Sequence, residues 1–147
     1  MYKNLLVPLD GSELSARAAT ASLELAAQLG AAVTAFVAEP TAPLPALGQR
    51  PTEYTRSVEA HDAKTEAHAR DVLQRFSELA AQAGVACTVH FERCTNVDEA
   101  IVEAANRLGC DMIVMVTHGR GALGELLFGT HTKNVLSRSR TPLLVLH

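Results

Sequence analysis

The stretch that decides the fold runs from residue 112 to residue 130 and reads MIVMVTHGRGALGELLFGT. Its first five residues, Met112 to Val116, are apolar, as expected of a strand that is buried on both faces. The glycines that follow let backbone N–H groups come close to a ligand, because no Cβ stands in the way. A helix is expected after them, and the free N–H groups at a helix start attract anions. The segment is therefore a candidate phosphate cradle.

The rest of the chain alternates short apolar runs with helical patterns. Strands are expected at 5–9, 32–37, 87–92, 112–116 and 142–146, and a helical pattern lies between each pair. Ser12 and Asn96 are expected to cap the first and third helices, and Gly30 to end the first. This βαβαβαβαβ order predicts an α/β fold: an open five-stranded parallel sheet, Rossmann-like, with helices on both faces.

Ligands of such sheets bind beyond the carboxyl ends of the strands, where the strand order reverses. Two segments of this chain follow strand ends. One is Asp10-Gly11-Ser12, and the other is the glycine-rich segment from residue 117 onward. We expect the two to face the same crevice.

Residues 39–57 contain four prolines, at positions 40, 43, 45 and 51. Proline is typical of loops, so this segment is predicted to be a flexible loop within a single domain that spans residues 1–147. A loop of this length either covers a site or is an exposed insertion. The long second helix is expected to follow it, over residues 58–83.

Composition excludes several functional classes. A net charge of −3 without a block of like charge argues against nonspecific nucleic-acid binding, and the absence of tryptophan argues against a base-stacking platform. No signal peptide and no apolar stretch of membrane-spanning length is evident, so we expect a cytoplasmic protein without a membrane partner. The cysteines, at positions 87, 94 and 110, lack zinc spacing and are expected to be reduced thiols.

Two common nucleotide motifs match the glycine segment only in part. Gly119-x-Gly121-x-x-Gly124 fits the dinucleotide fingerprint, but it follows the fourth strand, and no acidic residue occurs after Glu125 to hold a ribose. The spacing from Gly124 to Gly129 resembles half a Walker A loop, but the lysine that this loop needs is absent. Neither a nicotinamide site nor a Walker-type NTPase is predicted.

A third pattern fits better. Gly119 is separated by nine residues from Gly129-Thr130. Near the start of the chain, residues 7–12 read VPLDGS, and near its end, residues 142–146 read PLLVL. Together these features resemble the universal stress protein family over nearly the whole chain, and residues 1–147 are interpreted as one domain of that family. The resemblance implies a fold like that of the adenine nucleotide alpha hydrolases and a role in the stress response.

The family has a branch that binds adenine nucleotides and a branch that does not bind ATP. The binding branch has the pattern Gly-x-x-Gly-x9-Gly-Ser/Thr, in which Gly119, Gly129 and Thr130 match the last three fixed positions. Val116 occupies the first glycine position. A β-branched residue resists positive φ and fills space that a ribose or an α-phosphate needs. This departure leaves both branches open.

The resemblance implies a site for ATP or another adenine nucleotide at Pro8, Leu9, Asp10, Val37, Val116, His118, Gly119, Arg120, Gly129, Thr130, His131 and Thr132. The backbone N–H groups of Gly119, Gly129 and Thr130 would hold phosphate oxygens, and Arg120 would supply a countercharge. The same residues also have structural roles, since glycine suits a loop and Thr130 suits an N-cap.

At the other end of the ligand, Pro8, Leu9 and Val37 would frame the adenine, with backbone groups near Val37 reading its edge. Asp10 would bind the ribose or a phosphate-bound Mg²⁺. Asp10 can equally serve only to form a turn. His131 stands where the family more often has a small apolar residue, and it would either contact phosphate or replace a packing residue.

The function expected from these patterns is that of a nucleotide-binding stress sensor or regulator. Little or no hydrolysis is expected, because the sequence offers no evident general base or arginine aimed at a γ-phosphate, and no catalytic residue is assigned. Two alternatives stay open: a dimeric interaction module that is independent of nucleotide, and, more weakly, a small nucleotide phosphohydrolase. A homodimer through the terminal strand, residues 142–147, is expected because an apolar edge strand needs a partner.

Overall fold

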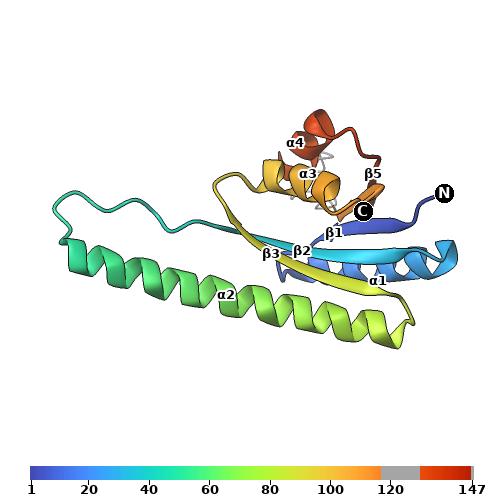
Figure 1. Ribbon diagram of the computed structural model, residues 1–147, viewed down its shortest axis with the longest axis horizontal. Helices are drawn as coiled ribbons and strands as arrows, with labels where there is room; N and C mark the ends of the chain where they lie inside the picture. The colour runs from blue at the N-terminus through green and yellow to red at the C-terminus, as the bar shows by residue number, and fades with distance from the viewer. Residues whose placement is uncertain (117–129, 147) are drawn as a thin grey trace, which may run out of the picture.

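A parallel five-stranded sheet forms the centre of the computed structural model, which describes residues 1–116 and 130–146 (Figure 1). Its strands stand in the order β3-β2-β1-β4-β5, and every neighbouring pair is parallel. The strands are β1 (Asn4–Pro8), β2 (Ala32–Pro40), β3 (Cys87–Cys94), β4 (Met112–Val116) and β5 (Leu143–Leu146). The predicted open α/β sheet is confirmed.

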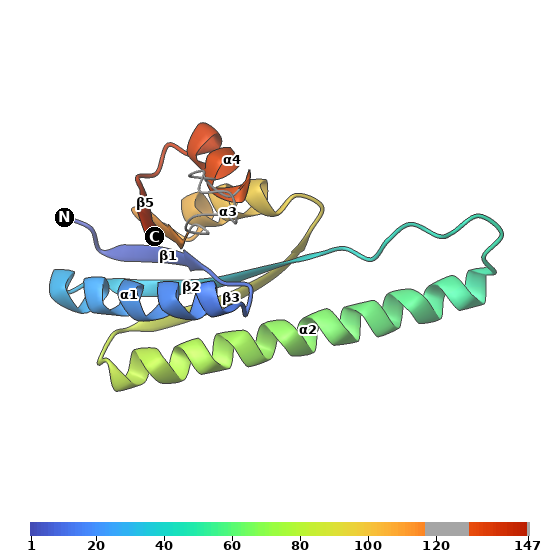
Figure 2. The same ribbon diagram turned by 180° about the vertical axis from the view of Figure 1, so that it is seen from behind.

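Helices cover both faces of this sheet, as Figures 1 and 2 show from opposite sides. They are α1 (Glu13–Leu29), α2 (Pro51–Gln82), α3 (Val97–Arg107) and α4 (Thr130–Arg138). Leu5 and Val7 of β1 point to the face covered by α1 and α2, whereas Leu6 between them points to the face covered by α3 and α4. This alternation produces two apolar layers, one on each side of the sheet.

The predicted helix caps are present. The hydroxyl of Ser12 accepts a hydrogen bond from the N–H of Ser15 at 3.2 Å, at the start of α1. At the start of α3, Oδ1 of Asn96 accepts from the N–H groups of Asp98 and Glu99, at 3.1 and 3.2 Å. Each cap satisfies N–H groups that have no partner within the helix, so these starts are determined locally by the sequence.

The loop predicted at residues 39–57 is shorter in the structure. Strand β2 continues to Pro40, and α2 begins at Pro51, so only residues 41–50 lie outside regular elements. Pro51 occupies the first helical position, where its fixed φ favours the helix and its missing N–H costs nothing. Glu53 supports the same start, because Oε2 accepts a hydrogen bond from the N–H of Arg50 at 3.4 Å. The proline at position 51 therefore starts a helix instead of prolonging the loop.

The segment between β2 and α2, together with the first turns of α2, projects beyond the sheet as an arm (Figure 1). Side chains tie its base to neighbouring strands. Nε2 of His61 lies 2.9 Å from the carbonyl oxygen of Pro40, and Nε of Arg93 in β3 lies 3.2 Å from Oδ1 of Asp62. These contacts hold α2 against the carboxyl ends of β2 and β3.

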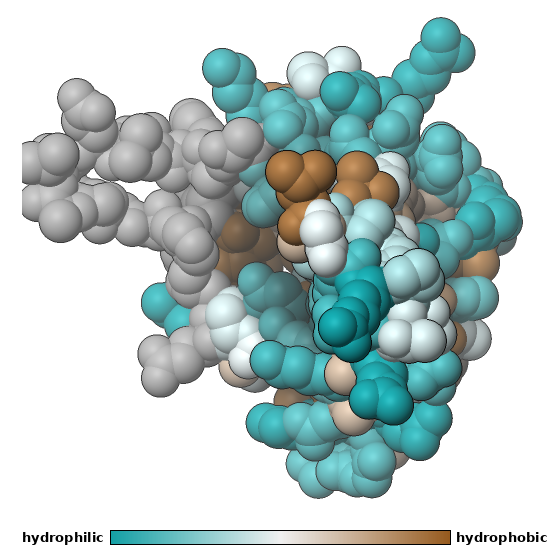
Figure 3. Space-filling view, turned by 90° about the vertical axis from the view of Figure 1, so that its left-hand side faces the viewer, coloured by the Kyte–Doolittle hydropathy of each residue, from teal (hydrophilic) through white to brown (hydrophobic). Residues whose placement is uncertain are grey.

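Two leucines in the arm, Leu44 and Leu47, are exposed to 89% and 107%. Figure 3 looks onto this end of the molecule and shows a small group of hydrophobic residues within a mainly hydrophilic surface. None of the helices within 1–116 and 130–146 combines the length and the apolarity needed to cross a membrane.

The strand order places the reversal of the chain between β1 and β4. Strand β1 pairs with β2 on one side and with β4 on the other. Strand β3 lies outside β2 at one edge of the sheet, and β5 lies outside β4 at the opposite edge. The crossovers that lead away from the two central strands therefore lie on opposite faces. This arrangement opens a crevice at the carboxyl ends of β1 and β4.

Candidate functional site

A cavity of about 280 Å³ lies in this crevice. Its walls come from the carboxyl ends of β1, β2 and β4, from the start of α1, and from α3 and α4. The lining residues are Pro8, Leu9, Asp10, Ser12, Ser15, Ala18, Phe36, Ala38, Val97, Ile101, Met115, Val116, His131 and Thr132. A largely apolar cavity with a few polar groups on one topological switch point is the usual form of a small-molecule site.

Six of the predicted site residues line this cavity: Pro8, Leu9, Asp10, Val116, His131 and Thr132. They come from segments up to 124 positions apart in the chain (132 minus 8), so the fold brings them together. Four others, His118, Gly119, Arg120 and Gly129, lie outside the described residues. Thr130 is the first residue of α4.

The side chain of Val37, which was expected to frame the adenine, is not among the lining residues of this cavity. Val37 is 1% exposed and belongs to the apolar layer under α1 and α2. Its neighbours Phe36 and Ala38 point to the opposite face and line the cavity. Because side chains alternate along a strand, only the backbone of Val37 remains for the predicted contact with adenine.

The loop after β1 is shaped by its own polar groups. Oδ1 of Asp10 accepts a hydrogen bond from the N–H of Ser12 at 2.9 Å, which is the turn predicted as its structural role. The N–H of Asp10 in turn donates to the hydroxyl of Ser15 at 3.2 Å. These bonds fix the carboxylate at the cavity, and its second oxygen, Oδ2, accepts no bond from the described residues. Asp10 therefore has both a structural role and an oxygen that can meet a ligand.

Val116 forms part of the wall without closing the cavity. It is the last residue of β4, pairs in register with Leu146 of β5 and is half-buried. The space beside it remains open to Pro8 and Met115, which line the same cavity. Val116 is thus one of the wall residues of a cavity of about 280 Å³.

Polar groups from α3 and α4 meet beside His131. Nδ1 of His131 lies 2.5 Å from Oδ1 of Asp98, and the side-chain amide of Asn134 donates to Oδ2 of Asp98 at 2.7 Å. The Asp98 side chain is only 10% exposed, whereas that of His131 is 68% exposed. A nearly buried carboxylate therefore holds an imidazole that reaches the cavity.

Sequence reasoning missed most of the apolar wall. Phe36 and Ala38 follow from the alternation in β2 once the face of Val37 is known. Val97 and Ile101 line the cavity because the first two turns of α3 pack over the same face of the sheet. No local motif marks these residues, and only the strand order reveals them.

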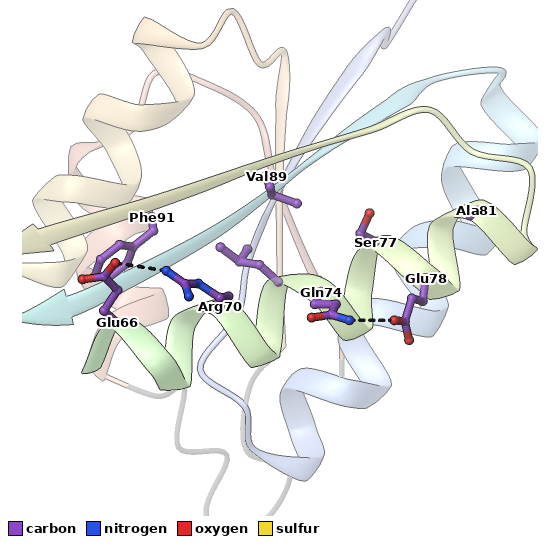
Figure 4. A pocket seen from close by; sticks show the side chains of 9 residues that line it. Glu66, Arg70, Gln74, Ser77, Glu78, Ala81, Val89 and Phe91 are labelled. Carbon is purple, nitrogen blue, oxygen red and sulfur yellow. Dashed lines mark hydrogen bonds and ion pairs between the residues drawn. The ribbon is translucent and has the colours of Figure 1, made fainter. Parts of the chain in front are cut away.

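A larger cavity, of about 560 Å³, lies elsewhere, between α2 and the edge strand β3. Figure 4 shows its lining: Val89 and Phe91 from the strand face the helix, where Glu66 contacts Arg70 and Gln74 contacts Glu78. These polar side chains pair along the helix itself, one turn apart, instead of converging on a point in the cavity. The smaller cavity is therefore the better candidate site.

Among the cysteines and the acidic residues of the described segments, the thiols are deactivated by burial. Burial raises the pKa of all three thiols, at Cys87, Cys94 and Cys110, so each is a weaker nucleophile at neutral pH than a free thiol. Across residues 1–116 and 130–146, no group of three or more His, Cys, Asp or Glu side chains is arranged to hold a metal ion.

The fold and the position of the cavity define a doubly wound α/β protein with a cavity at the reversal of its strand order. A profile of the universal stress protein family matches residues 1–147. A universal stress protein from Methanocaldococcus jannaschii is 30% identical over 146 residues, which cover 99% of this chain and 82% of the relative. One from Thermus aquaticus is 31% identical over 149 residues, covering 99% and 98% of the two chains. The chain belongs to the universal stress protein family.

Solved structures share the fold. UspA from Lactobacillus plantarum superimposes with a TM-score of 0.81 at 22% identity, covering 99% of this chain and 98% of its own. A universal stress protein in complex with cAMP has a TM-score of 0.70 at 23% identity, with coverage of 99% and 97%. An Arabidopsis thaliana family member with AMP bound has a TM-score of 0.64 at 15% identity, with coverage of 98% and 90%.

Proposed function

We propose that this chain binds an adenine nucleotide in the cavity between β1, β4, α3 and α4 and acts as a cytoplasmic sensor or regulator of the stress response. One observation carries the proposal: six predicted nucleotide-site residues, from three separate segments of the chain, line a single cavity at the strand reversal. The family relatives with cAMP and with AMP support the ligand class, since both share this fold.

The chemistry of the cavity suits such a ligand. Phe36, Ile101 and Met115 offer an apolar wall on which a purine can be buried. Asp10 and His131 stand at the polar part of the lining, and α4 begins next to His131. The start of a helix favours the negative charge of a phosphate by about 0.3–1 kcal/mol. An apolar base and an anionic tail thus both find matching surfaces.

Magnesium enters the proposal only through the nucleotide. A carboxylate oxygen is a ligand that Mg²⁺ accepts, and Mg²⁺ usually keeps several waters while bridging one carboxylate and phosphates. Asp10 would fill that role if ATP is the ligand. A single carboxylate suits binding of the metal–nucleotide complex, and we expect hydrolysis to be slow or absent.

Thermal unfolding with ligand tests the proposal. A ligand at a hundred times its Kd stabilises the folded state by about 2.7 kcal/mol. AMP, ADP and ATP with Mg²⁺ should therefore each be screened, and at least one should raise the melting temperature in a concentration-dependent way. GMP serves as the matched control for the base. A flat response to every adenine nucleotide would favour the second candidate, a dimeric module without a nucleotide.

One observation favours that second candidate. Strand β5 ends the sheet on one side, and all of its residues, Leu143 to Leu146, are apolar and only half-buried. An exposed apolar edge invites pairing with another strand. We propose a homodimer through residues 142–147, which is compatible with nucleotide binding and would survive without it.

A further inference from the structure

The cluster of Asp98, His131 and Asn134 has a defined proton arrangement. An ionised carboxylate only accepts hydrogen bonds, and both oxygens of Asp98 are engaged, one by each partner. Nδ1 of His131 must therefore carry a hydrogen. The nitrogen that remains for a ligand is Nε2. His131 and Asn134 stand three residues apart on α4, so they share the helix face that meets α3.

Asp98 and His131 differ in their exposure, and this difference indicates different roles. Asp98 is almost buried and is absent from the cavity lining, whereas His131 lines the cavity and is largely exposed. Asp98 therefore acts through His131, as a positioning residue. The bond from Asn134 holds the carboxylate, and the contact between Oδ1 of Asp98 and Nδ1 of His131 orients the imidazole, so the side chain that meets a ligand is already ordered.

The first turn of α4 is where an anion is favoured. Thr130, His131 and Thr132 open this nine-residue helix, and N–H groups of a first turn have no partner within the helix. His131 and Thr132 also line the cavity. A phosphate bound in this part of the cavity would meet Nε2 of His131, which can donate to an oxyanion only when the imidazole carries both protons.

We propose that His131, held by Asp98 and Asn134, recognises the phosphate of the bound nucleotide and binds it as an imidazolium. The cavity therefore prefers a nucleotide to the free nucleoside, and the protein takes up a proton when the nucleotide binds. This inference rests on the proposed function, because it specifies which part of an adenine nucleotide one residue recognises.

Three other ionisable side chains lie in the cavity lining or in the first turns of α3 and α4. Asp10 is the second ionisable group in the cavity lining. Glu99 shares the first turn of α3 with Asp98, but it lies 3.9 Å from Arg138 of α4. Lys133 lies in the first turn of α4 and is exposed. Among the described residues, Asp98 is the one that forms a hydrogen bond or ion pair with the imidazole. A proton taken up through this cluster is therefore assigned by comparing variants at position 131.

Titration calorimetry with AMP and with adenosine tests the inference. The wild-type chain, His131→Ala and His131→Gln are compared, with His90→Ala on the exposed face of β3 as the matched control. Loss of a charge-assisted hydrogen bond should weaken AMP binding by about ten- to a hundredfold in His131→Ala. Adenosine binding should change by less than about twofold, and His90→Ala should match the wild type.

Proton uptake is measured by repeating the AMP titration near neutral pH in buffers of different ionisation enthalpy. The wild type should take up more protons than His131→Ala. Subtracting the uptake of the variant from that of the wild type cancels the protons that the phosphate of AMP itself takes up. Gln can donate a hydrogen bond without titrating, so His131→Gln should recover part of the affinity without the proton uptake. Asp98→Asn should reduce the preference for AMP over adenosine, because it removes the charge that holds the imidazole.

The outcomes are distinct. Equal losses for AMP and adenosine in His131→Ala, or no loss for either, would overturn the phosphate-reading role while leaving adenine binding intact. Identical proton uptake by the wild type and His131→Ala would overturn the imidazolium. If the wild type binds adenosine and none of AMP, ADP and ATP, the inference fails; if it binds none of the four, the proposed function itself fails, and the inference fails with it.

Discussion

Nδ1 of His68 in α2 lies 2.5 Å from Oε1 of Glu39 in β2, and the same imidazole occupies the space that a side chain at Gly11 would need. A Cβ at position 11 would stand 2.8 Å from Nε2 of His68 and 3.0 Å from Cγ2 of Val72. The long helix α2 therefore braces the loop that carries Asp10 to the cavity. The prolines that precede this helix in sequence give no hint of that contact.

Gly11→Ala should destabilise the protein and loosen the site. Gly11 has φ of +83°, which costs an L-residue about 1–2 kcal/mol, and the new methyl group must displace His68. We expect the melting temperature to fall by about 4 °C or more and AMP affinity to fall with it. The control is Gly48→Ala, because Gly48 has φ of +79° but no atom within 4 Å of its ideal Cβ. Equal effects of the two substitutions in both measurements would show that His68 does not brace the loop.

Val116→Gly should strengthen nucleotide binding while it weakens the fold. The side chain lines the cavity at the end of β4, so its removal would give a ribose or phosphate more room. Glycine in a strand costs about 0.5–1 kcal/mol relative to alanine, and lost burial adds to this. Calorimetry with AMP and thermal unfolding measure the two effects. Val89→Gly, in the edge strand β3, is the control for the backbone cost. Unchanged or weaker AMP binding by Val116→Gly would exclude obstruction by this valine.

The three thiols should react slowly in the folded protein. Burial raises the pKa of Cys110, Cys87 and Cys94, and a raised pKa leaves less thiolate at any given pH. Alkylation by iodoacetamide, followed by mass spectrometry, should be slower than in urea at neutral pH and should accelerate as the pH rises. Cys110, which is buried, should be the slowest. Labelling of Cys94 at the rate of the unfolded chain would contradict the direction of its shift.

Val145→Lys should dissociate the proposed dimer. A charge on an edge strand opposes pairing with another strand, and Val145 is a half-buried residue of β5. Light scattering coupled to gel filtration at micromolar concentration should show a dimer for the wild type and a monomer for the variant. Val89→Lys places the same charge on β3, the other edge strand, and should leave the dimer intact. A wild-type monomer, or dissociation by Val89→Lys alone, would rule out pairing through β5.

Local signals in the sequence predicted the fold well. Ser12 and Asn96 cap helices through atoms two or three residues away, so a short window of sequence contains the cause. The proline at position 51 was misleading because the same residue type favours both loops and the first position of a helix. The predicted loop 39–57 was therefore too long, and only residues 41–50 lie between β2 and α2.

The site was predicted only in part, because its contacts are distant in the chain. The face on which Val37 lies depends on the register of β2 in the sheet, and a shift of one residue exchanges it with Phe36. The contact between Asp98 and His131 joins residues that are 33 positions apart. No motif spans that distance, so the positioning of His131 could be seen only after folding.

The central claim is that the cavity binds an adenine nucleotide. It is tested most directly by calorimetric titration of AMP into the wild type and into two variants in which a phenylalanine replaces an alanine. Ala38→Phe fills the cavity from its wall, and Ala63→Phe adds the same side chain on the exposed surface of α2. Saturable binding at one site per chain in the wild type and Ala63→Phe, but not in Ala38→Phe, is the predicted result. Binding that is undiminished in a folded Ala38→Phe, or absent from all three proteins, would contradict an adenine nucleotide site between β1 and β4.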